Sequence, residues 1–150
     1  MEWTATARAK ATPGQVLQVL THPEEIRRWS PVDFDLDELD GRRLAAGTRG
    51  RVTGRVAGVP VGFDVEVHAG DEAMLELSAE GPVAFDVRYE LMHDDCGAEL
   101  NASVAMRRGA GLTGRLVAKA TAAILSAGAL EGAAGRIARV AESQSSVAAA

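Results

Sequence analysis

His22, Glu24 and Glu25 are the first side chains in the sequence whose types and spacing could do chemistry. An imidazole beside two carboxylates supplies half of the ligands of a metal site. However, Thr21 and Glu24 have the three-residue spacing of a capping box, in which the threonine caps a helix and the glutamate reaches back to its amide. We therefore interpret this stretch as the start of a helix.

Residues 33–41, DFDLDELDG, begin like a calcium-binding loop, whose alternate acidic side chains supply oxygen ligands. Glu38 occupies the position that requires glycine, and Leu44 occupies the position of the bidentate glutamate. The alternation of Phe34 and Leu36 with acidic residues indicates an acidic-edged strand instead. We predict no metal site and no cofactor.

Cys96, His93 and Tyr89 are the remaining candidates for catalysis. A reactive thiolate needs a helix start or a basic cluster to lower its pKa, and Cys96 has neither in its sequence surroundings. Tyr89 and His93 could move protons, which leaves them as weak catalytic candidates. A buried tyrosine usually needs only a hydrogen-bond partner for its hydroxyl, and contact with a ligand is the alternative.

The composition is that of a soluble globular protein of 150 residues with a formal charge of −5 and one cysteine. Negative charge argues against nucleic acid as a partner, and a lone cysteine fits a reducing compartment. The N-terminus has no apolar segment typical of a signal peptide. Lys119 and Glu131 interrupt the most apolar window, so we expect a cytoplasmic protein without a membrane span.

The order of elements follows from periodicity and caps. Alternation over residues 3–10 predicts a strand, and Thr12, Pro13 and Gln15 predict a short helix with a capping box. The second short helix follows at Thr21. After Pro31, six alternating segments with short turns between them predict six consecutive antiparallel strands.

Apolar and small residues recur every three or four positions from about Gly111 to Glu142 and predict one helix of roughly 45 Å. Its inward face would consist of Leu112, Leu116, Ala120, Ala123, Ala127, Leu130, Ala134, Ile137 and Ala141. We assign residues 1–142 to one domain and expect residues 143–150 to be a disordered tail.

This order resembles the helix-grip fold of the SRPBCC or START-like superfamily, which includes polyketide cyclases, lipid carriers and relatives of the birch pollen allergen. The resemblance rests on TPGQVLQVLTHPEEIRRWSPV, on AAGTRGRV, and on the strand series that ends in a long helix. It implies an α+β fold, with a curved seven-stranded antiparallel sheet wrapped around the C-terminal helix. It also implies that two short helices between the first two strands close one end of the sheet. Trp29 would then pack at the edge of an internal cavity.

Strand alternation assigns the side chains that face this cavity. The opposite face carries charges of both signs on adjacent strands, where they can pair across the sheet. With the resemblance and the helical face, the predicted ligand-binding residues are Trp29, Phe63, Val65, Leu77, Phe85, Val87, Tyr89, Leu100, Val104, Leu116, Ala120, Ala123 and Ala127.

The small residues of the last helix have two interpretations. Alanines, with Gly128, Gly132 and Gly135, could allow the helix backbone to pack closely on the sheet, or could leave space for a ligand beneath it.

Our first hypothesis is a carrier of a small hydrophobic molecule (a lipid, isoprenoid, quinone or polyketide-like compound) bound between the sheet and the C-terminal helix. The alternatives are a polyketide cyclase or aromatase and a non-catalytic interaction module. The chain would act as a monomer or homodimer.

Overall fold

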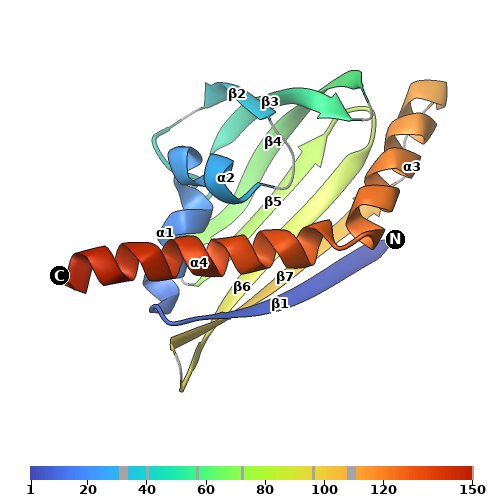
Figure 1. Cartoon of the computed structure of the whole chain (residues 1–150). Coiled ribbons are helices and arrows are strands. Elements are labelled where there is room, and N and C mark those ends of the chain that lie inside the picture. Colours follow the sequence, from blue (N-terminus) through green and yellow to red (C-terminus); the bar gives the residue numbers. More distant parts are fainter. Residues whose placement is uncertain are drawn as a thin grey trace.

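The computed structural model in Figure 1 shows a curved sheet with helices on one face, and one long helix crossing that face. The structure describes residues 1–30, 34–39, 41–56, 58–71, 73–95, 97–107 and 111–149. Asp33, Asp40 and Cys96 lie outside the described residues. Asp33 is the first residue of the segment that resembles a calcium-binding loop.

Among the described residues, seven strands form one antiparallel sheet in the order β1-β7-β6-β5-β4-β3-β2, so the first strand pairs with the last. The strands are β1 (Glu2–Ala9), β2 (Phe34–Leu39), β3 (Arg49–Val56), β4 (Val59–Asp71), β5 (Met74–Glu80), β6 (Ala84–Asp94) and β7 (Gly97–Arg107). The helices are α1 (Pro13–Thr21), α2 (Pro23–Trp29), α3 (Gly111–Ser126) and α4 (Ala129–Ala149). The predicted α+β class and the two short helices between β1 and β2 are confirmed.

The first capping box is present and the second is not. The Gln15 amide donates to the Thr12 hydroxyl at 3.2 Å, and the Thr12 amide donates to the Gln15 side chain at 2.8 Å. Thr21, however, is the last residue of α1, and its hydroxyl donates to the Leu17 carbonyl at 2.9 Å. Because Thr21 is still helical it cannot cap α2, which begins at Pro23 without a side-chain cap.

The prediction of a single C-terminal helix is wrong. The chain breaks between α3 and α4, whose axes differ by 59°. Gly128 has φ +100°, in the left-handed region where glycine commonly ends a helix. A periodicity of three and four residues continues through such a break, so the pattern could not reveal it. α4 in turn extends to Ala149, which makes the backbone helical where we expected a disordered tail.

α4 packs against the edge of the sheet formed by β1 and β7, in front of which it runs in Figure 1. Small side chains meet here: Ala133 and Ala134 of α4 are at most 1% exposed. The same core cluster contains Ala5, Ala9, Ala98, Ala102, Ile137, Ala138 and Ala141. Alanine on both surfaces lets the helix backbone approach the sheet closely.

Candidate functional site

An apolar cavity of about 320 Å³ lies between the short helices and strands β2 to β6. Leu20, Pro23 and Ile26 form its helical side. Among the described residues, its wall contains none from α3 or α4. The expected position between the sheet and the C-terminal helix is therefore corrected: α1 and α2 cover the cavity, while α4 covers the neighbouring half of the sheet.

Six of the predicted ligand-binding residues share this wall. They are Trp29, Phe63, Val65, Leu77, Val87 and Tyr89. The five strand residues lie together because the inward positions of β4, β5 and β6 are in register: Val67 pairs with Leu77, and Leu77 with Val87. Strand alternation selected these five residues, and the family resemblance selected Trp29.

The other predicted residues lie elsewhere. Leu100 and Val104 of β7 are 2% and 8% exposed in the core cluster that α4 covers. The Phe85 ring packs on the Phe63 ring, with centroids 5.7 Å apart. On α3, Leu116 and Ala123 are exposed and Ala120 is half-buried, and Ala127, in the turn after α3, is exposed. The kink at Gly128 turns this face of α3 away from the cavity.

The sequence-based selection missed the first half of the wall. Leu20 and Ile26 come from α1 and α2, and Leu36 and Leu39 come from the edge strand β2. The apolar positions of the two short helices were the available signal, but their face could not be assigned until the angle between helices and sheet was known. Val52, Val61 and Leu75, from β3, β4 and β5, also line the cavity.

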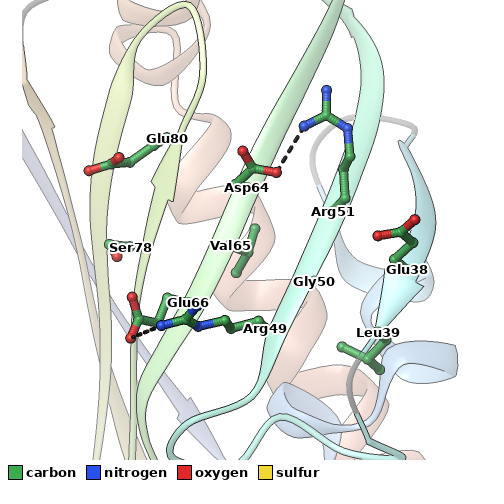
Figure 2. Close-up of a pocket in the computed structure, with 10 residues that line it drawn as sticks. All are labelled: Glu38, Leu39, Arg49, Gly50, Arg51, Asp64, Val65, Glu66, Ser78 and Glu80. Carbon is green, nitrogen blue, oxygen red and sulfur yellow. Dashed lines mark hydrogen bonds and ion pairs between the residues drawn. The ribbon is translucent and has the colours of Figure 1, made fainter.

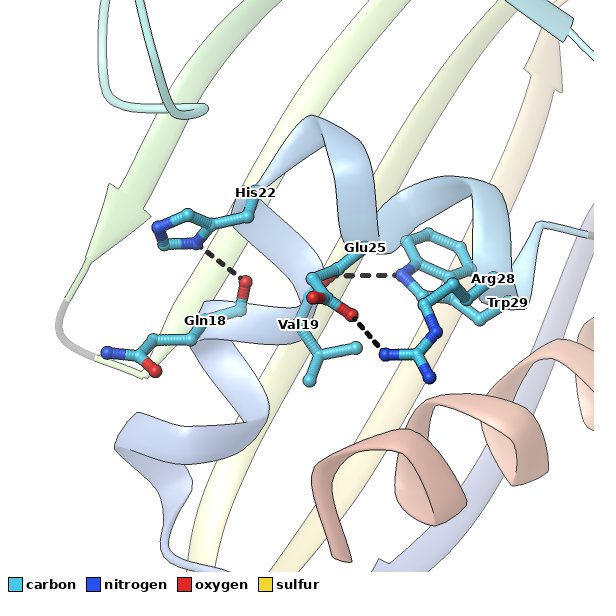
Figure 3. Close-up of polar contacts among 6 residues, drawn as sticks. All are labelled: Gln18, Val19, His22, Glu25, Arg28 and Trp29. Atoms are coloured by element: carbon cyan, nitrogen blue, oxygen red, sulfur yellow. Dashed lines mark hydrogen bonds and ion pairs between the residues drawn. The ribbon is translucent and has the colours of Figure 1, made fainter. Parts of the chain in front are cut away.

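Trp29 holds the two short helices together and forms part of the wall. Figure 3 shows its indole, whose Nε1–H donates to the Val19 carbonyl of α1 at 3.1 Å. Its ring meets the Tyr89 ring edge-on, with centroids 5.8 Å apart. The Arg136 guanidinium of α4 donates to the Trp29 carbonyl at 3.1 Å. Trp29 is thus both a core residue and a wall residue of the cavity.

Tyr89 carries a polar group that has no hydrogen-bond partner on the described part of the cavity wall. The residue is 6% exposed, and its hydroxyl makes no hydrogen bond to another described residue. Burial raises the pKa of the Tyr89 phenol well above its ordinary value, so the hydroxyl is neutral and able to donate. The Thr48 hydroxyl, also on the wall, accepts from the Ala45 amide and donates to the Arg43 carbonyl.

The other candidate catalytic and metal-binding residues that the structure describes do not line the cavity. His93 lies near the end of β6, exposed, with Nδ1 3.2 Å from the Asp94 carbonyl oxygen. His22 Nδ1 is 2.8 Å from the Gln18 carbonyl oxygen. A dashed line marks this contact in Figure 3. Within the described ranges, no three His, Cys, Asp or Glu side chains form a group that could hold a metal ion.

The opposite face of the sheet carries a shallow polar depression, shown in Figure 2. Arg51 and Asp64 approach to 2.8 Å across β3 and β4, and Arg49 and Glu66 to 3.7 Å. The predicted pairing of opposite charges on adjacent strands is confirmed. Because these side chains are solvated and neutralise one another, the depression offers no desolvated group for chemistry among its described residues.

No single helix within the described residues is long and apolar enough to cross a membrane. In the part of the chain that the structure describes, α3 and the segment of α4 up to Gln144 reach that length and composition together, and they are bent at the break.

No protein-family model matches the chain, and no curated protein matches its sequence. Solved structures do match. The protein TTHA0849 of Thermus thermophilus has a TM-score of 0.70 at 16% identity, covering 97% of this chain and 99% of that one. A START superfamily protein from Mycobacterium smegmatis has a TM-score of 0.57 at 16% identity, covering 87% and 94%. DynU16, from the dynemicin biosynthetic locus, has a TM-score of 0.62 at 21% identity, covering 95% and 48%. These likenesses show that the chain has the START-like helix-grip fold.

Proposed function

We propose that this protein binds a small hydrophobic molecule that carries one hydrogen-bond acceptor oxygen. The observation that supports this most directly is the apolar cavity with Tyr89 on its wall, whose hydroxyl has no hydrogen-bond partner among the described residues. A concave apolar wall with few polar groups is the usual form of a small-molecule pocket. The ligand's apolar area would supply the affinity, and Tyr89 would fix the ligand's orientation.

The size of the cavity favours a compact ligand. Its volume of about 320 Å³ lies at the lower end of the range for small-molecule pockets. A ring system such as a quinone or an aromatic polyketide fits this volume better than a lipid with two acyl chains. Burial of its apolar surface contributes roughly 25 cal/mol per Å² before the costs of binding are deducted.

Binding without catalysis is the better-supported activity. An acid–base reaction needs a donor and an acceptor of protons held close to the substrate. Tyr89 is a poor base because burial keeps its phenol protonated. The described part of the wall adds no carboxylate or imidazole, and the Arg55 guanidinium there donates to the Gly58 carbonyl at 3.1 Å.

The test compares two bicyclic ligands of similar size, 1,4-naphthoquinone, which has two carbonyl oxygens, and naphthalene, which has none. Calorimetry with wild-type protein should detect binding of both. Tyr89→Phe should weaken naphthoquinone binding by about 0.5–1.5 kcal/mol, the net value of one hydrogen bond, and leave naphthalene binding unchanged.

Two results would contradict the proposal. If wild-type protein binds neither compound, the cavity does not accept a small apolar molecule. Equal losses for both compounds in Tyr89→Phe would mean that the hydroxyl maintains the shape of the wall and does not contact the ligand. A mass spectrum of gently purified protein, searched for a retained hydrophobic compound, identifies the natural ligand class.

A further inference from the structure

The outward face of α3 is apolar although nothing in the described part of the chain covers it. Leu112 is 86% exposed, Leu116 is 53% exposed and Ile124 is 36% exposed. These three side chains form what we call the α3 stripe. Large apolar side chains gathered on one exposed face mark a contact with a partner or a membrane.

An adjoining side of α3 is already used. Val117 is 1% exposed and packs in a small cluster with Val61 and Val83. Because Ile124 follows Val117 by two helical turns, it lies at the border between this attached side and the rest of the α3 stripe. Leu112 and Leu116, which periodicity predicted to face the sheet, are exposed instead.

The two charged residues of α3 are both positive. Arg115 and Lys119 are exposed, and α3 contains no aspartate or glutamate. This contrasts with the formal charge of −5 for the whole chain. An amphipathic helix can lie in the surface of an anionic bilayer when leucine and isoleucine form its apolar side and its charged residues are cations.

We propose that α3 is a docking helix that lays the α3 stripe into the surface of a membrane rich in anionic lipids. A second copy of the chain is a poorer occupant. A two-fold contact through this stripe would bring Arg115 and Lys119 of both copies into one interface, with no carboxylate on either α3 to offset them.

Docking through α3 would also place the cavity close to the membrane. Val117, on the inner side of α3, shares its cluster with Val61 and with the half-buried Phe63. Both of these β4 residues also line the cavity. Docking through α3 would therefore hold the cavity next to the lipid surface, although the docking itself does not depend on which ligand is bound.

Sedimentation with lipid vesicles tests the proposal. Wild-type protein should bind vesicles that contain phosphatidylglycerol, bind pure phosphatidylcholine vesicles more weakly, and dissociate as salt is added. Replacing both leucines (Leu112→Asp with Leu116→Asp) should lower the partition coefficient by more than about tenfold. Each of Arg115→Gln and Lys119→Gln should lower it about fivefold, on anionic vesicles only.

Met92→Asp is the matched control, because Met92 is 51% exposed on β6, outside the α3 stripe. It should leave vesicle binding unchanged. Circular dichroism should show that all variants fold, since the substituted side chains are exposed. Naphthoquinone binding in the absence of vesicles should also be unchanged in the leucine variants, which separates this proposal from the proposed function.

Three outcomes would overturn the proposal. One is wild-type protein that does not bind anionic vesicles. Another is a double aspartate variant that binds them as well as wild type. The third is a wild-type dimer, seen by light scattering without lipid, that the double variant splits into monomers, because the stripe would then be an interface between copies.

Discussion

The two halves of the concave face differ in packing although both derive from the same strand alternation. Beneath α4, alanines of β1 and β7 meet alanines of the helix, and the inward side chains Ala9, Ala98 and Ala102 are at most 4% exposed. Beneath α1 and α2, the inward side chains Phe63, Leu77 and Val87 are larger but only half-buried. Small residues therefore accompany tight packing here, and larger residues surround the space.

This comparison decides between the two interpretations of the alanine-rich helix. Its buried alanines belong to the close contact of α4 with β1, and the cavity lies where neither C-terminal helix contributes a described wall residue. The mid-helix glycines do not belong to that contact. A Cβ added at Gly132 or Gly135 would meet only the guanidinium ends of Arg136 or Arg139, at 3.5 and 3.8 Å.

The largest expected effect comes from enlarging one residue in each half. Ala134 of α4 is fully buried in the packed half, so Ala134→Leu should destabilise the protein by about 1–3 kcal/mol through overpacking. Val87→Phe adds more carbon atoms on the cavity wall and should cost less than about 1 kcal/mol, because the space is already present. Urea unfolding of both variants measures the difference.

Val87→Phe should also abolish naphthalene binding, since its ring occupies the ligand's space. Equal destabilisation by the two substitutions would contradict the division of the face into a packed half and a cavity half.

The second prediction concerns the kink that separates α3 from α4. Gly128→Ala places a Cβ on a residue with φ +100° and should cost about 1–2 kcal/mol. Gly132→Ala is the control within α4, where helical backbone and free space should make alanine stabilising by about 0.5–1 kcal/mol. Thermal unfolding of the two single variants checks both signs. A stabilising Gly128→Ala would indicate that the two helices join into one straight helix over the sheet.

The sequence predicted most of the fold because its signals were local. Alternation selected the inward residues of β4 to β6, and the Thr12–Gln15 capping box fixed the start of α1. What it could not predict depends on relative orientation. The break at Gly128 is a property of one backbone angle, invisible to a pattern in which Ala123 and Ala127 continue the helical spacing. The helical side of the cavity depends on how α1 and α2 cross the sheet, which no spacing encodes.

Tyr89 stands on the boundary between the two halves, and its titration is the smallest effect we predict. In the sheet it pairs with Leu75 on the cavity side and with Ala102 on the packed side. Because burial raises the pKa of the Tyr89 phenol, the folded protein keeps the phenolic proton at a pH where the unfolded chain, with a pKa of about 10, releases it. The stabilisation from the neutral phenol is therefore fully present below about pH 10 and is lost as the pH rises above it.

The expected loss is about 1 kcal/mol between pH 10 and pH 11, since one pH unit corresponds to about 1.4 kcal/mol for a fully differential proton. Tyr89→Phe removes this contribution, so its free energy of unfolding should decline less than that of wild type over the same interval. Subtracting one free energy of unfolding from the other removes the contribution of lysine titration, because both proteins contain the same lysines. Parallel curves would mean that water reaches the hydroxyl and ionises it in the folded state, which would place Tyr89 on an open, hydrated part of the cavity wall.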